Sequence, residues 1–201
     1  MLAALTGALL GAWHVVSGPD HLAAIAPLAT SSSRTHSPWR AGLAWGLGHA
    51  SGVWLVGLLL LAFGALLPLE ALGVWSERLV GLLIVGVGVW GLWRVRHPHD
   101  HDHDHAHTRG PAFVIGAVHG LAGSSHLYGV LPALALDEGQ RVGYLIAFGI
   151  GSVLAMACFS SLLALLVERL PGSRDVVRTW ALRVASIAAV VIGAAWLVFG
   201  G

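Results

Sequence analysis

Histidine pairs separated by six residues occur twice in this chain, each within a similar frame of glycine, alanine and leucine. The two runs read GAWHVVSGPDHL over residues 11–22 and GAVHGLAGSSHL over residues 116–127. The paired side chains are His14 with His21 and His119 with His126. Both runs lie in apolar stretches long enough to cross a bilayer, where ionisable side chains mark ion or substrate pathways. We therefore expect a binding site at the interface of two repeats.

Asp20 is the only acidic residue inside any span that we predict below. An ionised carboxylate at the bilayer centre costs about 2.5–3.5 kcal/mol on insertion scales, so it needs a partner or a purpose. The preceding Gly18-Pro19 predicts a helix break, because proline removes a backbone donor and disfavours helical geometry in the residue before it. Such a break can bring His14, His21 and the carboxylate together. The alternative is that Asp20 only caps a helix near the membrane surface.

Further candidate ligands come from the second span and the second repeat. His49 lies in a GLGHASG run, and its counterpart in the second repeat is Ser152, so the site is expected to be asymmetric. Imidazole and carboxylate donors without a thiolate suit Ni(II), Co(II), Zn(II) or Cu(II). Proton relay is the main rival role. The predicted metal ligands are His14, Asp20, His21, His49, His119 and His126, and the predicted supporting residues are Gly18, Pro19, Gly123, Ser124 and Ser125.

The composition predicts an integral membrane protein. Of the 201 residues, 56% are hydrophobic and 10% are charged, whereas soluble domains carry roughly a quarter charged residues. All eleven Lys or Arg positions are arginine, and they are scattered at segment ends. A nucleic-acid partner is therefore not expected. The single cysteine, Cys158, excludes an intramolecular disulfide.

Hydropathy predicts an all-α fold with six transmembrane helices, over residues 2–29, 41–67, 78–95, 112–136, 142–167 and 179–200. The first and fourth are expected to be broken. The halves match beyond the histidine motif, since AWGLG at residues 44–48 returns as AFGIG at 147–151. Three spans per half make the second half an inverted repeat of the first. We predict three segments: a first repeat over 1–95, a His-rich loop over 96–110 and a second repeat over 111–201.

The arginines predict the orientation. Eight of them lie in the loops after spans one, three and five, and only Arg78 and Arg141 lie in the opposite loops. The positive-inside rule puts the arginine-rich loops in the cytoplasm and both termini outside a cytoplasmic membrane. The N-terminal stretch has no basic n-region, so we expect a retained first helix rather than a signal peptide.

The predicted cytoplasmic loop contains the run HPHDHDHDHAH over residues 97–107. Alternating histidine and aspartate cannot form a packed core, but it can gather divalent transition metals loosely. A merely solvated loop is the alternative. The histidines concerned are His97, His99, His101, His103, His105 and His107.

With these motifs in place, the chain resembles the nickel/cobalt transporter superfamily, in the branch of six-span urease-accessory (UreH-type) membrane proteins. The first-helix signature of a histidine, a short spacer and Asp-His is matched by His14, Asp20 and His21, although five residues separate His14 from Asp20 where the permease signature has four. Gly-Leu-Gly-His49 resembles the second-helix motif, and the run from His119 resembles the small-residue motif of the accessory branch. The resemblance implies that His14, Asp20, His21 and His49 bind metal, and that Ni²⁺ or Co²⁺ is the cargo.

We expect a secondary transporter of Ni²⁺ or Co²⁺, with Zn²⁺ as a further candidate cargo, no tightly bound cofactor and a slight preference for import from the resemblance. The lipid bilayer, the ion and a cytoplasmic metallochaperone are the candidate partners. The alternatives are a proton-coupled exporter of a small anion or metabolite, with the loop as a metal sensor, and a haem-binding or quinone-linked subunit. An enzyme is not expected, because no His-Glu-x-x-His motif occurs and no histidine follows His126 to activate a serine.

Overall fold

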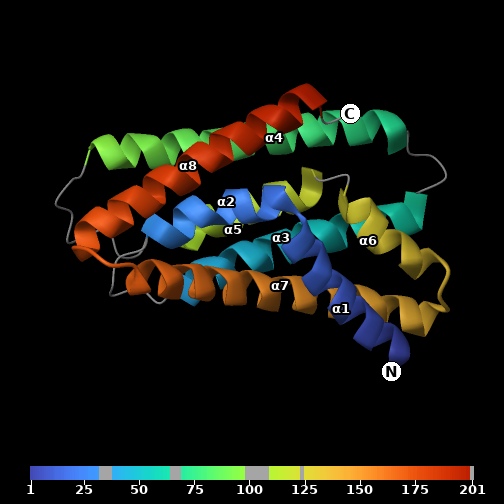
Figure 1. Ribbon diagram of the computed structural model, residues 1–201. Helices are drawn as coiled ribbons and strands as arrows, with labels where there is room; N and C mark the ends of the chain where they lie inside the picture. The colour runs from blue at the N-terminus through green and yellow to red at the C-terminus, as the bar shows by residue number, and fades with distance from the viewer. Residues whose placement is uncertain (32–37, 64–68, 98–108, 123–124, 200–201) are drawn as a thin grey trace.

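A computed structural model describes residues 1–31, 38–63, 69–97, 109–122 and 125–199 of this chain. Across these ranges every regular element is an α-helix (Figure 1). The helices are α1 (Leu2–Ser17), α2 (Pro19–Ser31), α3 (Pro38–Phe63), α4 (Leu69–Arg96), α5 (Arg109–Ala122), α6 (Ser125–Leu134), α7 (Glu138–Arg169) and α8 (Arg174–Phe199).

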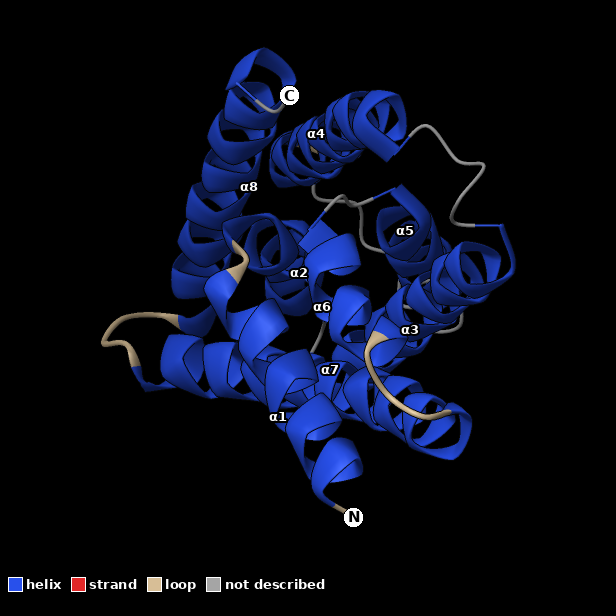
Figure 2. Cartoon of the chain, turned by 90° about the vertical axis from the view of Figure 1, so that its right-hand side faces the viewer, coloured by secondary structure: helices blue, strands red, loops and turns tan. Residues whose placement is uncertain are grey.

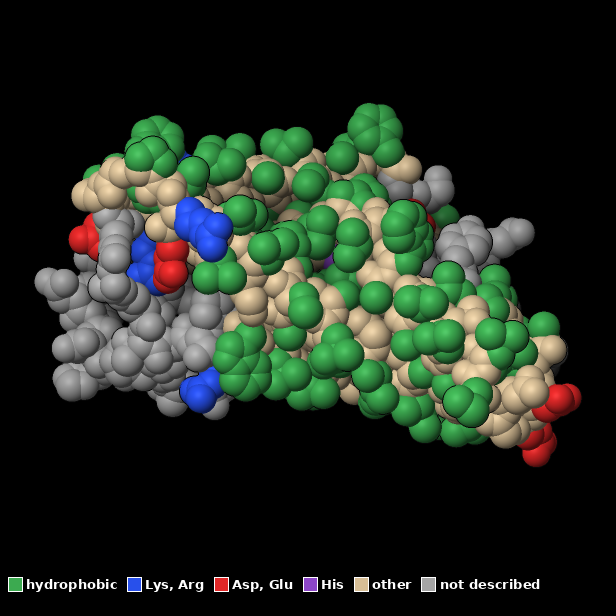
Figure 3. Space-filling view, turned by 60° about the horizontal axis from the view of Figure 1, so that its bottom comes forward, with side chains coloured by type: hydrophobic (Ala, Val, Ile, Leu, Met, Phe, Trp, Pro, Cys, Tyr) green, Lys and Arg blue, Asp and Glu red, His purple; other side chains and the backbone are tan. Residues whose placement is uncertain are grey.

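Four of these helices are long and apolar enough to cross a membrane, namely α3, α4, α7 and α8. The pair α1 and α2 meets the same test as one broken span with a bend of 73°. Hydrophobic side chains cover the middle of the surface in Figure 3, and the charged ones gather towards its two ends. The protein is therefore a multi-pass membrane protein, with four candidate spans or five if the bent pair counts as one.

The break between α1 and α2 falls where Gly18-Pro19 predicts it. Gly18 has extended backbone angles (φ −88°, ψ 103°), and its N–H donates to His14 O at 3.1 Å to close α1. Proline at position 19 disfavours helical geometry in the residue before it, so the chain turns and starts α2 at Pro19. The bend places the end of α1 and the start of α2 in the interior of the bundle.

The helices form three layers. In Figures 1 and 2, α4 and α8 lie together in one outer layer, α7 and α1 lie in the opposite one, and α2, α5 and α6 lie between them, with α3 between α5 and α7. The middle layer therefore brings the short helices α2, α5 and α6 next to the long helices. This arrangement puts the predicted ligand segments at the centre of the molecule.

Glycines allow α1 to approach α7, and α3 to approach α5, at backbone distance. A Cβ at Gly11, Gly48, Gly116 or Gly151 would strike a carbonyl oxygen of the facing helix. Such close approach at small residues is common between membrane helices. Two contacts between α1 and α7 have a counterpart between α3 and α5, at positions that correspond in the two halves of the sequence. Gly11 faces Phe148 O as Gly116 faces Trp45 O, and Gly151 faces Ala8 O as Gly48 faces Phe113 O.

The α4–α8 pair also packs through glycines at backbone distance. A Cβ at Gly81 would meet Gly193 O, and a Cβ at Gly193 would meet Gly81 O. About two turns further along α4, a Cβ at Gly88 would meet Ser186 O. Close reciprocal contacts of this kind fix the register of two long helices against each other.

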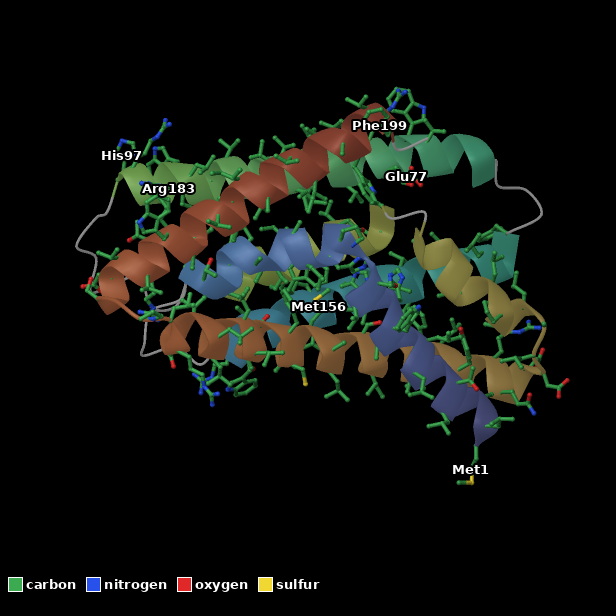
Figure 4. The ribbon with its side chains drawn as sticks, in the orientation of Figure 1. Met1, Glu77, His97, Met156, Arg183 and Phe199 are labelled. Carbon is green, nitrogen blue, oxygen red and sulfur yellow. The ribbon has the colours of Figure 1, made fainter. Side chains whose placement is uncertain are left out.

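One predicted boundary was wrong. Helix α4 begins at Leu69 instead of residue 78, so Glu77 lies inside it and Asp20 is not the only acidic residue within the helical spans. The polar residues before Arg78 resemble a loop in hydropathy, but glutamate, alanine and leucine are good helix formers and extend the helix. Glu77 lies near the end of the molecule in Figure 4, far from His97 at the opposite end.

Helix α6 is joined to α7 by side chains of α7. The Tyr144 hydroxyl donates to Gly129 O at 2.7 Å, and the Arg141 guanidinium donates to Ala133 O at 3.1 Å and to Leu136 O at 2.9 Å. Arg141 thus satisfies carbonyls at the end of α6 that have no partner within the helix. The short helix is held in place although it is only 10 residues long.

The packing makes a prediction about glycine substitutions. Gly151→Ala should destabilise the protein by about 1–3 kcal/mol, because the added methyl group strikes the backbone of α1 and one helix must move. Gly86→Ala is the matched control, since nothing lies within 4 Å of a Cβ there. The unfolding midpoint of each variant in detergent measures the difference. An equal midpoint for the two variants would contradict the contact.

Candidate metal centre

Five of the six predicted ligands inside the membrane come together at the break between α1 and α2. His14 lies in the last turn of α1, and Asp20 lies in the first turn of α2 beside His21. His49 comes from α3 and His119 from the last turn of α5. We call these five side chains the His/Asp cluster.

The cluster is almost completely enclosed. Asp20 is 3% exposed, and His21, His49 and His119 are fully buried. His14 is partly exposed. The interpretation of Asp20 as a surface helix cap is therefore wrong, because its carboxylate points into the bundle and contacts histidines.

The Asp20 carboxylate joins α2 to α5. Its Oδ1 atom lies 3.0 Å from His21 Nδ1, and its Oδ2 atom lies 3.2 Å from His119 Nε2. In each contact an imidazole N–H donates to a carboxylate oxygen. The carboxylate is thus satisfied by two histidines that lie 98 positions apart in sequence, one from each half of the chain.

His21 occupies the centre of the cluster. Its ring centroid lies 4.5 Å from that of His14, 5.0 Å from that of His49 and 4.7 Å from that of His119. All three contacts are edge-on, with interplanar angles from 73° to 82°. Each neighbouring ring therefore meets an edge or a face of one central imidazole.

The donor atoms form two groups whose members lie within 4.8 Å of one another. One group is His14, His21 and His49, and the other is Asp20, His21 and His119. Nitrogen and carboxylate donors in this number suit a divalent first-row transition metal, with water completing the coordination. The cluster is a potential metal site without a thiolate, as the sequence predicts.

Trp45 forms a wall of the cluster that the sequence interpretation did not include. Its indole stacks on His49 at 5.1 Å with an interplanar angle of 13°, and it lies 5.3 Å from the His119 ring. Phe148 lies 5.6 Å from the His14 ring. Trp45 and Phe148 are matching positions of the AWGLG and AFGIG runs, and that match was the available signal.

Position 152, which corresponds to His49 in the second half of the sequence, does not carry a histidine. Ser152 stands at that position, and its hydroxyl donates to Gly11 O at 3.1 Å and to Phe148 O at 2.9 Å. The side chain is therefore used to join α7 to α1. The predicted asymmetry of the cluster follows from this difference.

Several predicted residues lie outside what the structure describes. For His126 and Ser125 the backbone belongs to α6, but their side chains are not described. Gly123, Ser124, His99, His101, His103, His105 and His107 are also outside the described residues. His97 is exposed at the end of α4, with its ring stacked on Trp93 at 5.1 Å.

Comparisons with known proteins identify relatives over nearly the whole chain. A family model described as "HupE / UreJ protein" matches residues 3–199. The chain is 33% and 34% identical to "Chloroplast protein FOR GROWTH AND FERTILITY 2" and "1" of Arabidopsis thaliana, over 98% and 96% of its own length. It spans only 56% and 58% of those two relatives. No solved structure matches the chain.

A bacterial protein is a further relative. The chain is 29% identical to "Urease accessory protein UreH" of Bacillus sp. (strain TB-90), over 82% of this chain and 78% of that protein. Both the family model and this relative agree with the resemblance that the first-helix motif carries.

Gly18 gives a test of the geometry in which no ligand residue is replaced. A Cβ at this position would lie 2.5 Å from His21 Nδ1 and 2.8 Å from Asp20 Oδ1. Its backbone angles are accessible to alanine, so Gly18→Ala should displace the two ligands without breaking the fold. We expect its affinity for Co²⁺ to fall by at least about tenfold, the lower end of the loss seen when the partners that orient metal ligands are removed.

Equilibrium dialysis of purified protein in detergent measures this affinity, with Gly86→Ala as the control. Unchanged Co²⁺ affinity of the Gly18→Ala protein would show that the residues at the break do not hold the ion.

Proposed function

This chain belongs to the HupE/UreJ family, and from this premise we propose that it is a secondary transporter that moves a divalent transition-metal ion through the His/Asp cluster. One observation carries the proposal: a buried carboxylate and four imidazoles converge at a helix break inside a multi-pass membrane protein. Ionisable groups are rare in membrane helices and gather on ion or substrate pathways. Broken helices line the substrate sites of many secondary transporters.

We propose six membrane crossings, with α5 and α6 as the second broken span. The exchanged glycine contacts support two inverted repeats, because a pseudo-two-fold axis would pair each of these contacts with its counterpart. The rings around the cluster follow the same rule. His14 contacts Phe148 as His119 contacts Trp45, and both pairs are matching positions of the two halves. The three proposed segments, 1–95, 96–110 and 111–201, follow from this symmetry.

The proposed orientation puts the His-rich loop in the cytoplasm and both termini outside. Arg183 and His97 lie at one end of the molecule in Figure 4, and Met1, Glu77 and Phe199 lie towards the other. Arg94 and Arg96 end α4 at the His97 end. Arginine concentrates on the cytoplasmic side of membrane proteins, which supports this orientation in a cytoplasmic membrane.

We propose Ni²⁺ or Co²⁺ as the cargo, with Zn²⁺ as the next candidate and import as the favoured direction. The nitrogen and oxygen donors support this class of ion, and the relative named as a urease accessory protein agrees with the resemblance to nickel/cobalt transporters. The direction rests on the resemblance alone. The loop would collect or deliver ions on the cytoplasmic side, where a metallochaperone is a candidate partner.

An exporter of small anions is less well supported by the charges near the cluster. An anion would need a cationic side chain facing it within the membrane. Arg183 instead lies over the Trp180 ring at 4.8 Å, near the end of the molecule. Asp20 would repel an anion at the centre of the cluster, whereas it attracts a divalent cation.

The central prediction concerns flux. Protein reconstituted in liposomes should move Ni²⁺ or Co²⁺ to a trapped metal-sensitive dye. His21→Ala or Asp20→Asn should reduce the initial rate at least about a hundredfold. An ion pathway that loses a central ligand must desolvate the cation without compensation. Ser186→Ala is the control, since this buried hydroxyl lies between α4 and α8. Wild-type rates for both cluster variants would reject the proposed pathway.

The His-rich run should have a different effect. Deleting residues 97–107 should leave the maximal rate within about twofold of the wild type while raising the ion concentration for half-maximal flux, because loose side chains collect ions without forming the pathway. A concentration series of the same flux measurement separates the two parameters. Complete loss of flux in the deletion variant would place the run within the pathway itself.

A further inference from the structure

We propose that the His/Asp cluster holds the ion at two successive positions that share His21 as a common ligand. This inference rests on the proposed function and specifies how the ion passes through the site. The first position is the group of His14, His21 and His49, and the second is the group of Asp20, His21 and His119.

The spacing of the donors argues for two positions. A divalent transition metal binds imidazole nitrogen at about 2.0–2.1 Å, so two nitrogens on one ion lie no more than about 4.2 Å apart. The donors of the cluster fall into two compact groups with one common member. His49 and His119 approach His21 from different helices, and neither group contains both of them. An ion centred in one group is therefore not centred in the other.

His21 can serve both positions through its two ring nitrogens. Its Nδ1 atom contacts Asp20 Oδ1 at 3.0 Å, on the side of the second group. Its Nε2 atom is the second ring nitrogen, and we assign it to the first group, whose His14 and His49 rings contact the His21 ring. A carboxylate that accepts the N–H of a metal-bound imidazole fixes its orientation and tautomer. Asp20 thus orients His21 for the first position and becomes a ligand itself at the second.

Burial gives the two positions an order. His14 is partly exposed, so the first group includes a side chain that can meet an arriving ion. Every member of the second group is at least 97% buried, so that position is enclosed. The shared ligand and the repulsion of two divalent ions at short distance in a low-dielectric interior make the positions mutually exclusive. The ion advances by exchanging the partners of His21.

Binding of Co²⁺ distinguishes the positions, because each ligand set gives its own visible absorption. The full chain is titrated in detergent, and the spectrum of the His21→Ala protein is subtracted to remove ions held by the His-rich loop. We expect the wild type to bind a single Co²⁺ in the cluster. His14→Ala and His119→Ala should each still bind a single Co²⁺, with spectra that differ from each other.

Flux in liposomes completes the test. Both His14→Ala and His119→Ala should lose at least about tenfold in Co²⁺ flux while retaining binding, because each stops the ion at one position. His14→Gln and His119→Gln preserve side-chain volume and replace any alanine variant that does not elute as a monodisperse species. Ser186→Ala is again the matched control.

Three results would overturn the two positions. The cluster holds one site if the His14→Ala and His119→Ala proteins both lose Co²⁺ binding, as the His21→Ala protein does, while the wild type binds and transports. It holds independent sites if the wild type binds two ions in the cluster. A group is not on the path if flux is unchanged when the histidine that belongs to that group alone, His14 or His119, is replaced. Absence of both binding and flux in the wild type would instead reject the proposed function.

Discussion

The Asp20 carboxylate is the constraint on which the rest of this structure depends. A charged group within a membrane protein must be paired, and here two imidazole N–H groups from opposite halves of the chain surround it. One of these, on His119, requires α5 to end beside the start of α2. The other, on His21, requires a helix that begins at the membrane interior. The break at Gly18 and the middle layer of short helices both follow from placing this carboxylate.

Close packing converts these requirements into a fixed geometry. Without a hydrophobic driving force between helices in lipid, contact of backbones at small residues holds membrane helices together. Gly116 and Gly120 bring α5 against the backbone of Trp45 and His49 on α3. The same contact that joins the helices therefore sets the distance between His119 and His49. The positions of the ligands depend on this packing, and a shift of α5 by one turn relative to α3 would separate His119 from His49.

Much of this arrangement could be predicted from the sequence, and the exceptions have physical causes. The Gly18-Pro19 break is a local property of the backbone, and repeated histidines in apolar stretches indicate a shared site, so His14, Asp20, His21, His49 and His119 could all be named in advance. The division into two groups could not, because it depends on the angle of 73° between two helices and on ring orientations.

The two remaining exceptions came from residues whose types are ambiguous in sequence. Trp45 resembles any apolar membrane residue until the packing of α3 on α5 places its indole beside the His119 ring. Glu77 resembles a loop residue in hydropathy, although the helix propensity of its neighbours extends α4 through it. Tertiary packing decided the outcome for Trp45, whereas helix propensity outweighed hydropathy for Glu77.

Anomalous X-ray diffraction from crystals grown with Co²⁺ would test the central claim most directly, since it locates the ion without reference to transport. The account predicts anomalous density within bonding distance of His21, flanked by the donors of one of the two groups. Density confined to the run at residues 97–107, with the Asp20 carboxylate still held by His21 and His119 alone, would contradict it.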